Sequence, residues 1–208
     1  MSFRKYPDRI DTKPSIPKET MSKALRDNQK SKVYASEAAA FDRYKTSPEF
    51  KTTDECDAFL RKVMSGKVFQ RTYPYTKDWN ILIRAGQGTR KASASQITLD
   101  GDTWRVITLP KWARRREVIL HELAHHINDV ESKDKPYASH GWEFAVIFLD
   151  LVQKGMGKAA KQRLKDEFKA RKVYTWERKR SAHTEEHRKM LAERMIRINA
   201  AKKGLTGG

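Results

Sequence analysis

The pattern of apolar and polar positions divides the chain into a polar start, a mixed middle and a basic end. Early in the middle part, the apolar spacing predicts two helices, at Tyr34–Lys45 and Thr53–Met64, with Gly66 at a helix C-cap position. The run Trp79–Arg84 then reads as a strand. We therefore expect helices to precede a sheet.

The next segment has the pattern of a β-hairpin. Ser95–Leu99 and Trp104–Leu109 are short strand-like runs, and Asp100-Gly101 between them is a dipeptide typical of tight hairpin turns. Pro110 ends the second run, because proline has no backbone N–H to donate to a neighbouring strand. The sequence thus predicts at least one antiparallel strand pair.

Two strongly apolar helices are expected after the hairpin. Ala113–Asn128 carries too many apolar residues for a surface helix, which indicates burial on more than one face. Ser139 is the expected N-cap of a second helix that runs to about Lys154, and Gly155 and Gly157 mark its end. These two helices are expected to form the centre of the fold.

Charge separates the two ends from the middle. Of the net charge of +18, residues 1–32 contribute nine Lys/Arg against four Asp/Glu, and residues 155–208 sixteen against six, while residues 33–154 are nearly balanced at nineteen against sixteen. Two further helices are expected in the basic end, at Lys158–Val173 and Thr184–Ala201. Such ends suit non-specific binding of a nucleic acid and, less well, of an anionic membrane surface, although charge that only keeps a surface solvated remains an alternative.

The predicted fold class is therefore α+β, with a small antiparallel-containing sheet packed on two central apolar helices. We expect three parts: a flexible basic arm at 1–32, a core at 33–155 and a basic helical tail at 156–208.

The only cysteine, Cys56, excludes an internal disulfide and a multi-cysteine metal site. No apolar run resembles a secretory leader or a membrane span, so we expect a cytoplasmic protein without a membrane anchor. The oligomeric state is left open.

The candidate chemistry lies in the first central helix. His121-Glu122-Leu123-Ala124-His125 matches H-E-x-x-H, and positions i and i+4 share one helix face, so both imidazoles can reach one metal ion. A zinc ion with three protein ligands keeps a position for water, whose pKa it lowers to about 7. Glu122 is placed to take a proton from that water as general base. Two histidines and a carboxylate merely packed in an apolar core would be costly to bury unpaired.

A third ligand is expected from the start of the second apolar helix. His140 follows His125 after fourteen intervening residues, enough to bring the chain back beside the first helix. Glu143, one turn further on, is the alternative ligand. His126 points about 100° away from His125, so we interpret it as a supporting or packing residue. Tyr137 is either an ordinary loop residue or a hydrogen-bond donor to the developing oxyanion.

The succession of H-E-x-x-H, this gap and then H-G-x-x-F at His140–Phe144 resembles the SprT-like (Spartan) metalloprotease family. It is also similar to small H-E-L-A-H-H metallohydrolases of bacteria and bacteriophages. The resemblance covers about residues 55–155 and is specific over 118–149. It implies a zincin-like core, an intracellular peptidase acting on proteins crosslinked to or bound on DNA, Glu122 as catalytic residue, and as zinc ligands His121, His125 and His140. The cysteine-rich zinc ribbon of many such proteins is missing, so any contact with DNA falls to the basic ends.

Two other features bear on function. His183-Thr184-Glu185-Glu186-His187 matches the inverted motif H-x-x-E-H, but its strongly charged flanks offer no apolar shell, so we interpret it as an exposed helix start. Trp104–Leu109, directly before the metal-binding helix, is either the sheet edge that pairs with an extended substrate or an ordinary core strand.

The sequence thus favours a zinc-dependent peptidase with a protein substrate. A nucleic-acid-binding protein with a structural metal site, and a zinc hydrolase of a non-peptide bond, are the alternatives.

Overall fold

The structure, a computed structural model, describes residues 25–42, 48–88, 91–133, 136–176 and 193. Within these residues the fold is α+β, as predicted, with six α-helices and a three-stranded mixed sheet. The elements are α1 (Lys30–Ala40), α2 (Thr53–Met64), α3 (Lys67–Thr72), β1 (Asn80–Ala85), β2 (Ser93–Leu99), β3 (Asp102–Leu109), α4 (Arg116–Glu131), α5 (Trp142–Met156) and α6 (Lys158–Ala170), with short 3-10 turns at Pro74–Thr76 and Lys111–Ala113. The chain divides into two compact units, 1–176 and 177–208, and all these elements belong to the first.

The sheet has the strand order β1-β3-β2. The predicted hairpin is confirmed: β2 and β3 pair antiparallel, with Leu99 opposite Asp102. The turn residues Asp100 and Gly101 have φ of 51° and 84°, the left-handed values that a two-residue hairpin turn requires. On its other side β3 pairs parallel with β1, which makes the sheet mixed.

The position of β3 corrects one prediction. Trp104–Leu109 is not an edge that could accept a substrate strand, because β3 has hydrogen-bonded neighbours on both sides. The parallel pairing with β1 is a non-local contact, and neither strand's own pattern reveals it. Among the described strands, the edges of the sheet are β1 and β2.

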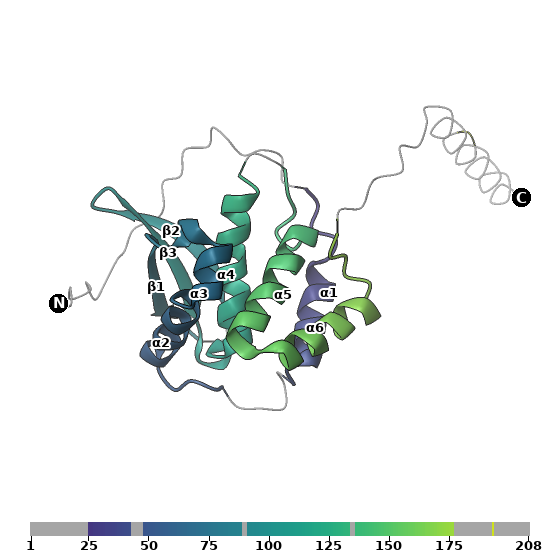
Figure 1. Cartoon of the computed structure of the whole chain (residues 1–208), viewed down its shortest axis with the longest axis horizontal. Coiled ribbons are helices and arrows are strands. Elements are labelled where there is room, and N and C mark those ends of the chain that lie inside the picture. Colours follow the sequence, from purple (N-terminus) through teal and green to yellow (C-terminus); the bar gives the residue numbers. More distant parts are fainter. Residues whose placement is uncertain (1–24, 43–47, 89–90, 134–135, 177–192, 194–208) are drawn as a thin grey trace, which may run out of the picture. The chain divides into compact units, whose positions relative to one another are not determined.

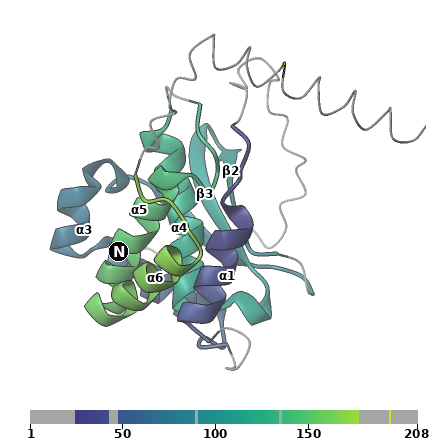
Figure 2. The ribbon, with the colours of Figure 1, turned by 90° about the vertical axis from the view of Figure 1, so that its right-hand side faces the viewer.

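Helices α4, α5 and α6 pack in succession away from the sheet (Figure 1). Helix α4 contacts β2 and β3, α5 contacts α4, and α6 contacts α5. Figure 2 shows α1, α6 and α5 side by side, with α1 against α6. Because α4 lies between the sheet and α5, most of its surface is buried, as its apolar composition predicts. Several of its polar side chains, among them His121, Glu122 and His126, consequently lie in the interior.

Several helix boundaries differ from those predicted. Helix α2 spans the predicted Thr53–Met64, but Gly66 is the N-cap of the unpredicted α3 and not the end of α2. Helix α1 begins at Lys30, four residues before Tyr34, and ends at Ala40, shortly before Asp42 with its left-handed φ of 49°.

The two central helices also start later than predicted. Residues Lys111–Ala113 form a 3-10 turn, so α4 begins at Arg116. Gly141, in an extended conformation, replaces Ser139 as the N-cap of α5. The predicted Lys158–Val173 helix is α6, whose Leu164 and Phe168 are buried in the core. The predicted helix Thr184–Ala201 lies outside the described residues, apart from Glu193.

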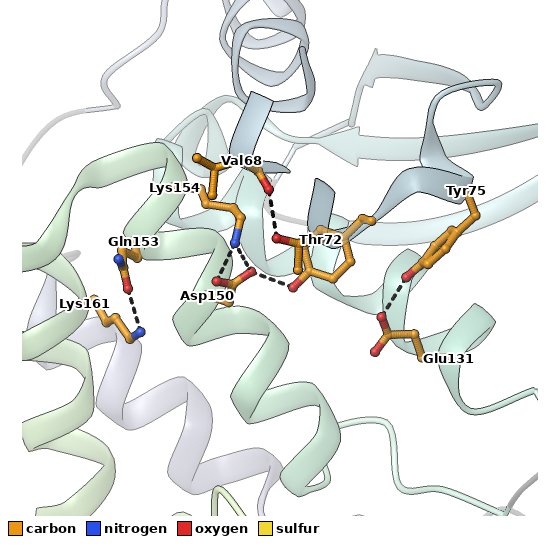
Figure 3. A network of polar contacts seen from close by, with 9 residues as sticks. Val68, Thr72, Tyr75, Glu131, Asp150, Gln153, Lys154 and Lys161 are labelled. Carbon is orange, nitrogen blue, oxygen red and sulfur yellow. Dashed lines mark hydrogen bonds and ion pairs between the residues drawn. The ribbon is translucent and has the colours of Figure 1, made fainter. Parts of the chain in front are cut away.

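Polar contacts connect the end of α3 and the following 3-10 turn to the central helices α4 and α5 (Figure 3). The Tyr73 hydroxyl donates to the Asp150 carboxylate at 2.7 Å, and the Lys154 ammonium donates to the same group. The Tyr75 hydroxyl donates to Glu131 at 2.8 Å. Burial and then the bond to Asp150 raise the pKa of Tyr73, so its hydroxyl remains a donor. No helix among the described residues has the length and apolar character needed to cross a membrane.

Candidate metal centre

Helix α4 brings His121 and His125 to the same face, as their spacing of four residues requires. Their ring centroids lie 5.0 Å apart with the rings nearly perpendicular. His140 joins them from the loop that leads into α5, and its centroid lies 4.7 Å from that of His125. Each of the three rings offers one nitrogen, and these nitrogens all lie within 4.8 Å of one another. The three histidines singled out in the sequence thus form one cluster that could hold a metal ion.

The donor set fits zinc. The Nε2 atoms of His121 and His140 are 3.4 Å apart. Two nitrogens that are each about 2.0–2.1 Å from one tetrahedral zinc lie about 3.3 Å from each other. Three imidazoles without a fourth protein ligand are also the ligand set of many catalytic zinc sites, in which water takes the open position.

The conformation of the H-G-x-x-F segment explains why its second residue is glycine and its fifth is phenylalanine. A Cβ on Gly141 would stand 3.1 Å from the carbonyl oxygen of Ala138, so a larger residue would crowd the turn that carries His140. The nearer carboxylate oxygen of Glu143, at 2.8 Å, ends a flexible side chain and can move aside. One helical turn later, Phe144 packs against the histidine cluster, with its ring centroid 4.5 Å from that of His125. The motif therefore supplies one imidazole, the space to place it and an apolar wall beneath the cluster.

Burial favours the neutral, metal-binding form of His125 and His140. His121 and His140 are 1% and 3% exposed, and His125 is partly exposed. Burial, and after it the repulsion that a protonated His125 would meet from protonated His121 or His140, lowers the pKa of His125 to about 2. Burial also lowers the pKa of His140, although the neighbouring Asp27 carboxylate opposes that shift.

These shifts predict how the metal-free protein responds to acid. An unfolded histidine takes up a proton near pH 6.5, whereas the fold lowers the pKa of His125 to about 2 and that of His126 to about 4. Protonation below pH 6.5 therefore favours the unfolded chain. Stability present above pH 6.5 should be lost as the pH falls, by up to about 1.4 kcal/mol per pH unit for each histidine. Denaturant unfolding of chelator-treated protein at pH 7.5 and 5.5 measures this, and equal free energies of unfolding would contradict it.

Glu122 lies beside the cluster and not within it. It is 4% exposed and borders a cavity of about 530 Å³ that also reaches His121. The other residues around this cavity are Asp27, Lys30, Ser31, Tyr34, Glu37, Lys91, Ala92, Trp112 and Val118. A carboxylate at this position can exchange a proton with a molecule that enters the cavity next to a metal on the three imidazoles.

The other candidate residues lie apart from the cluster. Glu143 is not among the residues whose ligand atoms meet there. The Tyr137 hydroxyl donates to Asp129, which favours the ordinary loop interpretation. His126 is buried on α4, and burial followed by the charge of Arg105 lowers its pKa. The inverted motif at 183–187 lies outside the described residues.

Three residues near the cluster were not singled out in the sequence. The carboxylates of Glu37 and Asp27 contact the Nδ1 atoms of His121 and His140, and the Tyr34 ring stacks on His121 with a centroid distance of 5.1 Å. Asp27 lies in the segment predicted to be a flexible arm. The sequence holds one indication that Glu37 is buried. Three alanines follow this single acidic residue, whereas a surface helix usually carries more charge.

Comparisons of the chain with protein-family models, with curated proteins and with solved structures find no match. The resemblance to SprT-like metalloproteases therefore stays a prediction carried by the motifs. What the geometry establishes is a largely buried cluster of three histidines that could hold a metal ion, with Glu122 beside it.

Proposed function

We propose that this protein is a zinc-dependent hydrolase that cleaves peptide bonds. The observation that carries the proposal is the meeting of three imidazole nitrogens within 4.8 Å of one another beside a cavity bordered by Glu122. His121, His125 and His140 are the proposed ligands, and Glu122 is the proposed general base.

Zinc bound by three imidazoles would supply a water whose pKa is lowered to about 7 and would polarise the carbonyl group to be cleaved. Glu122 would accept a proton from that water and deliver it to the departing amine. Its largely buried position keeps bulk water from competing for the proton. The rings of Phe144, against His125, and Tyr34, against His140, would help to hold these imidazoles in place.

A purely structural metal site is the less favoured alternative. Structural zinc sites are usually closed by four protein ligands, often cysteines. Among the described residues, the cluster consists of three histidines, and the only cysteine of the chain is buried within the hydrophobic core. The cavity next to His121 also gives access that a structural site does not need.

The sheet and the cavity together favour an extended peptide as substrate. Strand β2 is an edge of the described sheet, and Ala92, directly before it, borders the cavity. A peptide that added itself to β2 would use main-chain hydrogen bonds for binding and would run toward the cluster. The walls formed by Tyr34, Trp112 and Val118 would suit an apolar side chain.

A cleavage assay tests the proposal. We expect zinc-loaded protein to cut a mixture of unfolded proteins, with activity lost after treatment with a chelator and restored by zinc. Mass spectrometry of the products gives the cleavage sites. Hydrolysis of simple esters or phosphodiesters without any peptide cleavage would contradict the peptidase assignment.

A further inference from the structure

Two carboxylates contact the histidine cluster on the side that faces away from its centre. The Oε2 atom of Glu37 lies 3.0 Å from Nδ1 of His121, and the Oδ2 atom of Asp27 lies 2.7 Å from Nδ1 of His140. The Nε2 atoms of the same two rings face each other at 3.4 Å. Each ring therefore has one nitrogen at a carboxylate and the other in the cluster.

This arrangement selects one form of each imidazole. A neutral imidazole carries a hydrogen on one nitrogen and a lone pair on the other, and an ionised carboxylate can only accept a hydrogen bond. The hydrogen bond between Asp27 and His140 thus places the hydrogen on Nδ1 of that ring, and the charge of Glu37 at ion-pair distance favours the same form of His121. In this form the lone pair is on Nε2. That is the form in which Nε2 can bind a metal ion, with the ring held in a fixed orientation.

The contact with His121 also explains why the carboxylate of Glu37 is buried. Its side chain is 0% exposed, and a buried carboxylate is costly unless it has a polar partner. Tyr34 and Glu37 are three residues apart on α1 and share one helix face, from which Tyr34 stacks on the same imidazole, His121. Helix α1 therefore directs both side chains toward the first residue of the H-E-x-x-H motif.

The segment before α1 holds His140 at two points. Asp27 contacts its ring, and the Gln29 side-chain amide donates to its backbone carbonyl at 3.3 Å. The Gln29 side-chain oxygen in turn accepts a hydrogen bond from the backbone N–H of Tyr174, beyond α6. His121 and His125 are placed by a rigid helix, whereas His140 belongs to a loop, so its position depends more on such contacts.

We propose that Asp27 and Glu37 are positioning residues of the metal centre, each of which orients one zinc-binding imidazole. The segment from Asp27 to Glu37 is then part of the site, although it lies more than eighty residues before the H-E-x-x-H motif. The inference rests on the metal-binding half of the proposed function and is independent of which bond is cleaved.

Zinc affinity of full-length variants, measured by competition with a chromogenic chelator, tests the proposal. Asp27→Asn and Glu37→Gln keep the shape of each side chain and remove its charge. We expect each to weaken zinc binding by about 10–100-fold, the usual effect of removing such a partner. Asp27→Glu, which restores a carboxylate, should recover part of the loss. Glu143→Gln is the matched control, because this carboxylate is close to His140 in sequence but outside the cluster.

A second readout separates positioning from simple stabilisation. The side chain of Asp27 is 22% exposed, so the metal-free Asp27→Asn protein should unfold at nearly the wild-type temperature. With cobalt(II) in place of zinc, its visible absorption bands should nevertheless shift, because one ligand is less well oriented. Zinc affinities within twofold of wild type in both variants, or a lowered unfolding temperature with unchanged affinity and cobalt spectrum, would overturn the inference. A wild-type protein that binds no zinc would instead overturn the proposed function.

Discussion

Replacing Glu122 by glutamine is expected to abolish peptide cleavage while zinc stays bound. Glutamine has nearly the same shape but cannot accept and return a proton at neutral pH. Glu122 borders the same cavity as His121 but is not among the residues whose ligand atoms meet, so its loss should leave the ligand set intact. Removal of a positioned general base typically lowers the rate by about 10²–10⁴-fold. The measurement is kcat on a cleaved peptide, with zinc content determined on the same sample.

The matched control for this variant is Glu143→Gln. Glu143 is an acidic residue in the first turn of α5 and lies outside the cluster, so its substitution should leave kcat within a few-fold of wild type. Wild-type kcat in the Glu122→Gln protein would refute the general-base role. Loss of zinc from that protein would make Glu122 a ligand.

Replacing His125 by alanine is expected to remove the stabilisation that zinc confers. His125 is one of the three proposed ligands, and two imidazoles alone hold zinc poorly. A metal present at 100 times its dissociation constant raises the free energy of unfolding by about 2.7 kcal/mol, which corresponds to roughly 5–10 °C in unfolding temperature for a domain of this size. Thermal unfolding with and without added zinc should show this shift in wild type and little or none in His125→Ala.

His126→Ala is the control for the loss of an adjacent histidine. His126 is buried on the same helix but lies outside the cluster, so its variant should be less stable and yet keep the zinc-dependent shift. A full shift in His125→Ala would show that zinc binds elsewhere.

The central part of the site could be predicted from sequence because its geometry is local. Four residues separate His121 from His125, and the helical repeat alone places both imidazoles on one face. His140 could be proposed because its spacing and its H-G-x-x-F context resemble a known pattern. The three rings do meet in the structure, while their role as zinc ligands stays a prediction.

The partners of these histidines could not be predicted in the same way. Asp27 is 113 residues from His140, and no local pattern connects the two. The same limit applies to the sheet. The hairpin of β2 and β3 follows from the local turn at Asp100-Gly101, whereas the parallel pairing of β1 with β3 depends on the packing of the whole fold.

The prediction of a nucleic-acid partner rests on charge alone. Helix α6 accounts for part of the positive charge assigned to the tail, and its buried Leu164 and Phe168 belong to the core. Beyond Trp176 the chain carries nine Lys/Arg against four Asp/Glu. These residues lie outside the described part of the structure apart from Glu193, so binding through this segment stays a prediction.

The most direct test of the metal centre is X-ray absorption spectroscopy at the zinc edge on purified, zinc-loaded protein. We predict one zinc ion per chain, with three imidazole nitrogens at about 2.0–2.1 Å and one further oxygen from water. The His140→Ala protein measured alongside should lose one imidazole contribution or the metal itself. A wild-type protein that binds no zinc, or binds it without histidine ligands, would contradict the account.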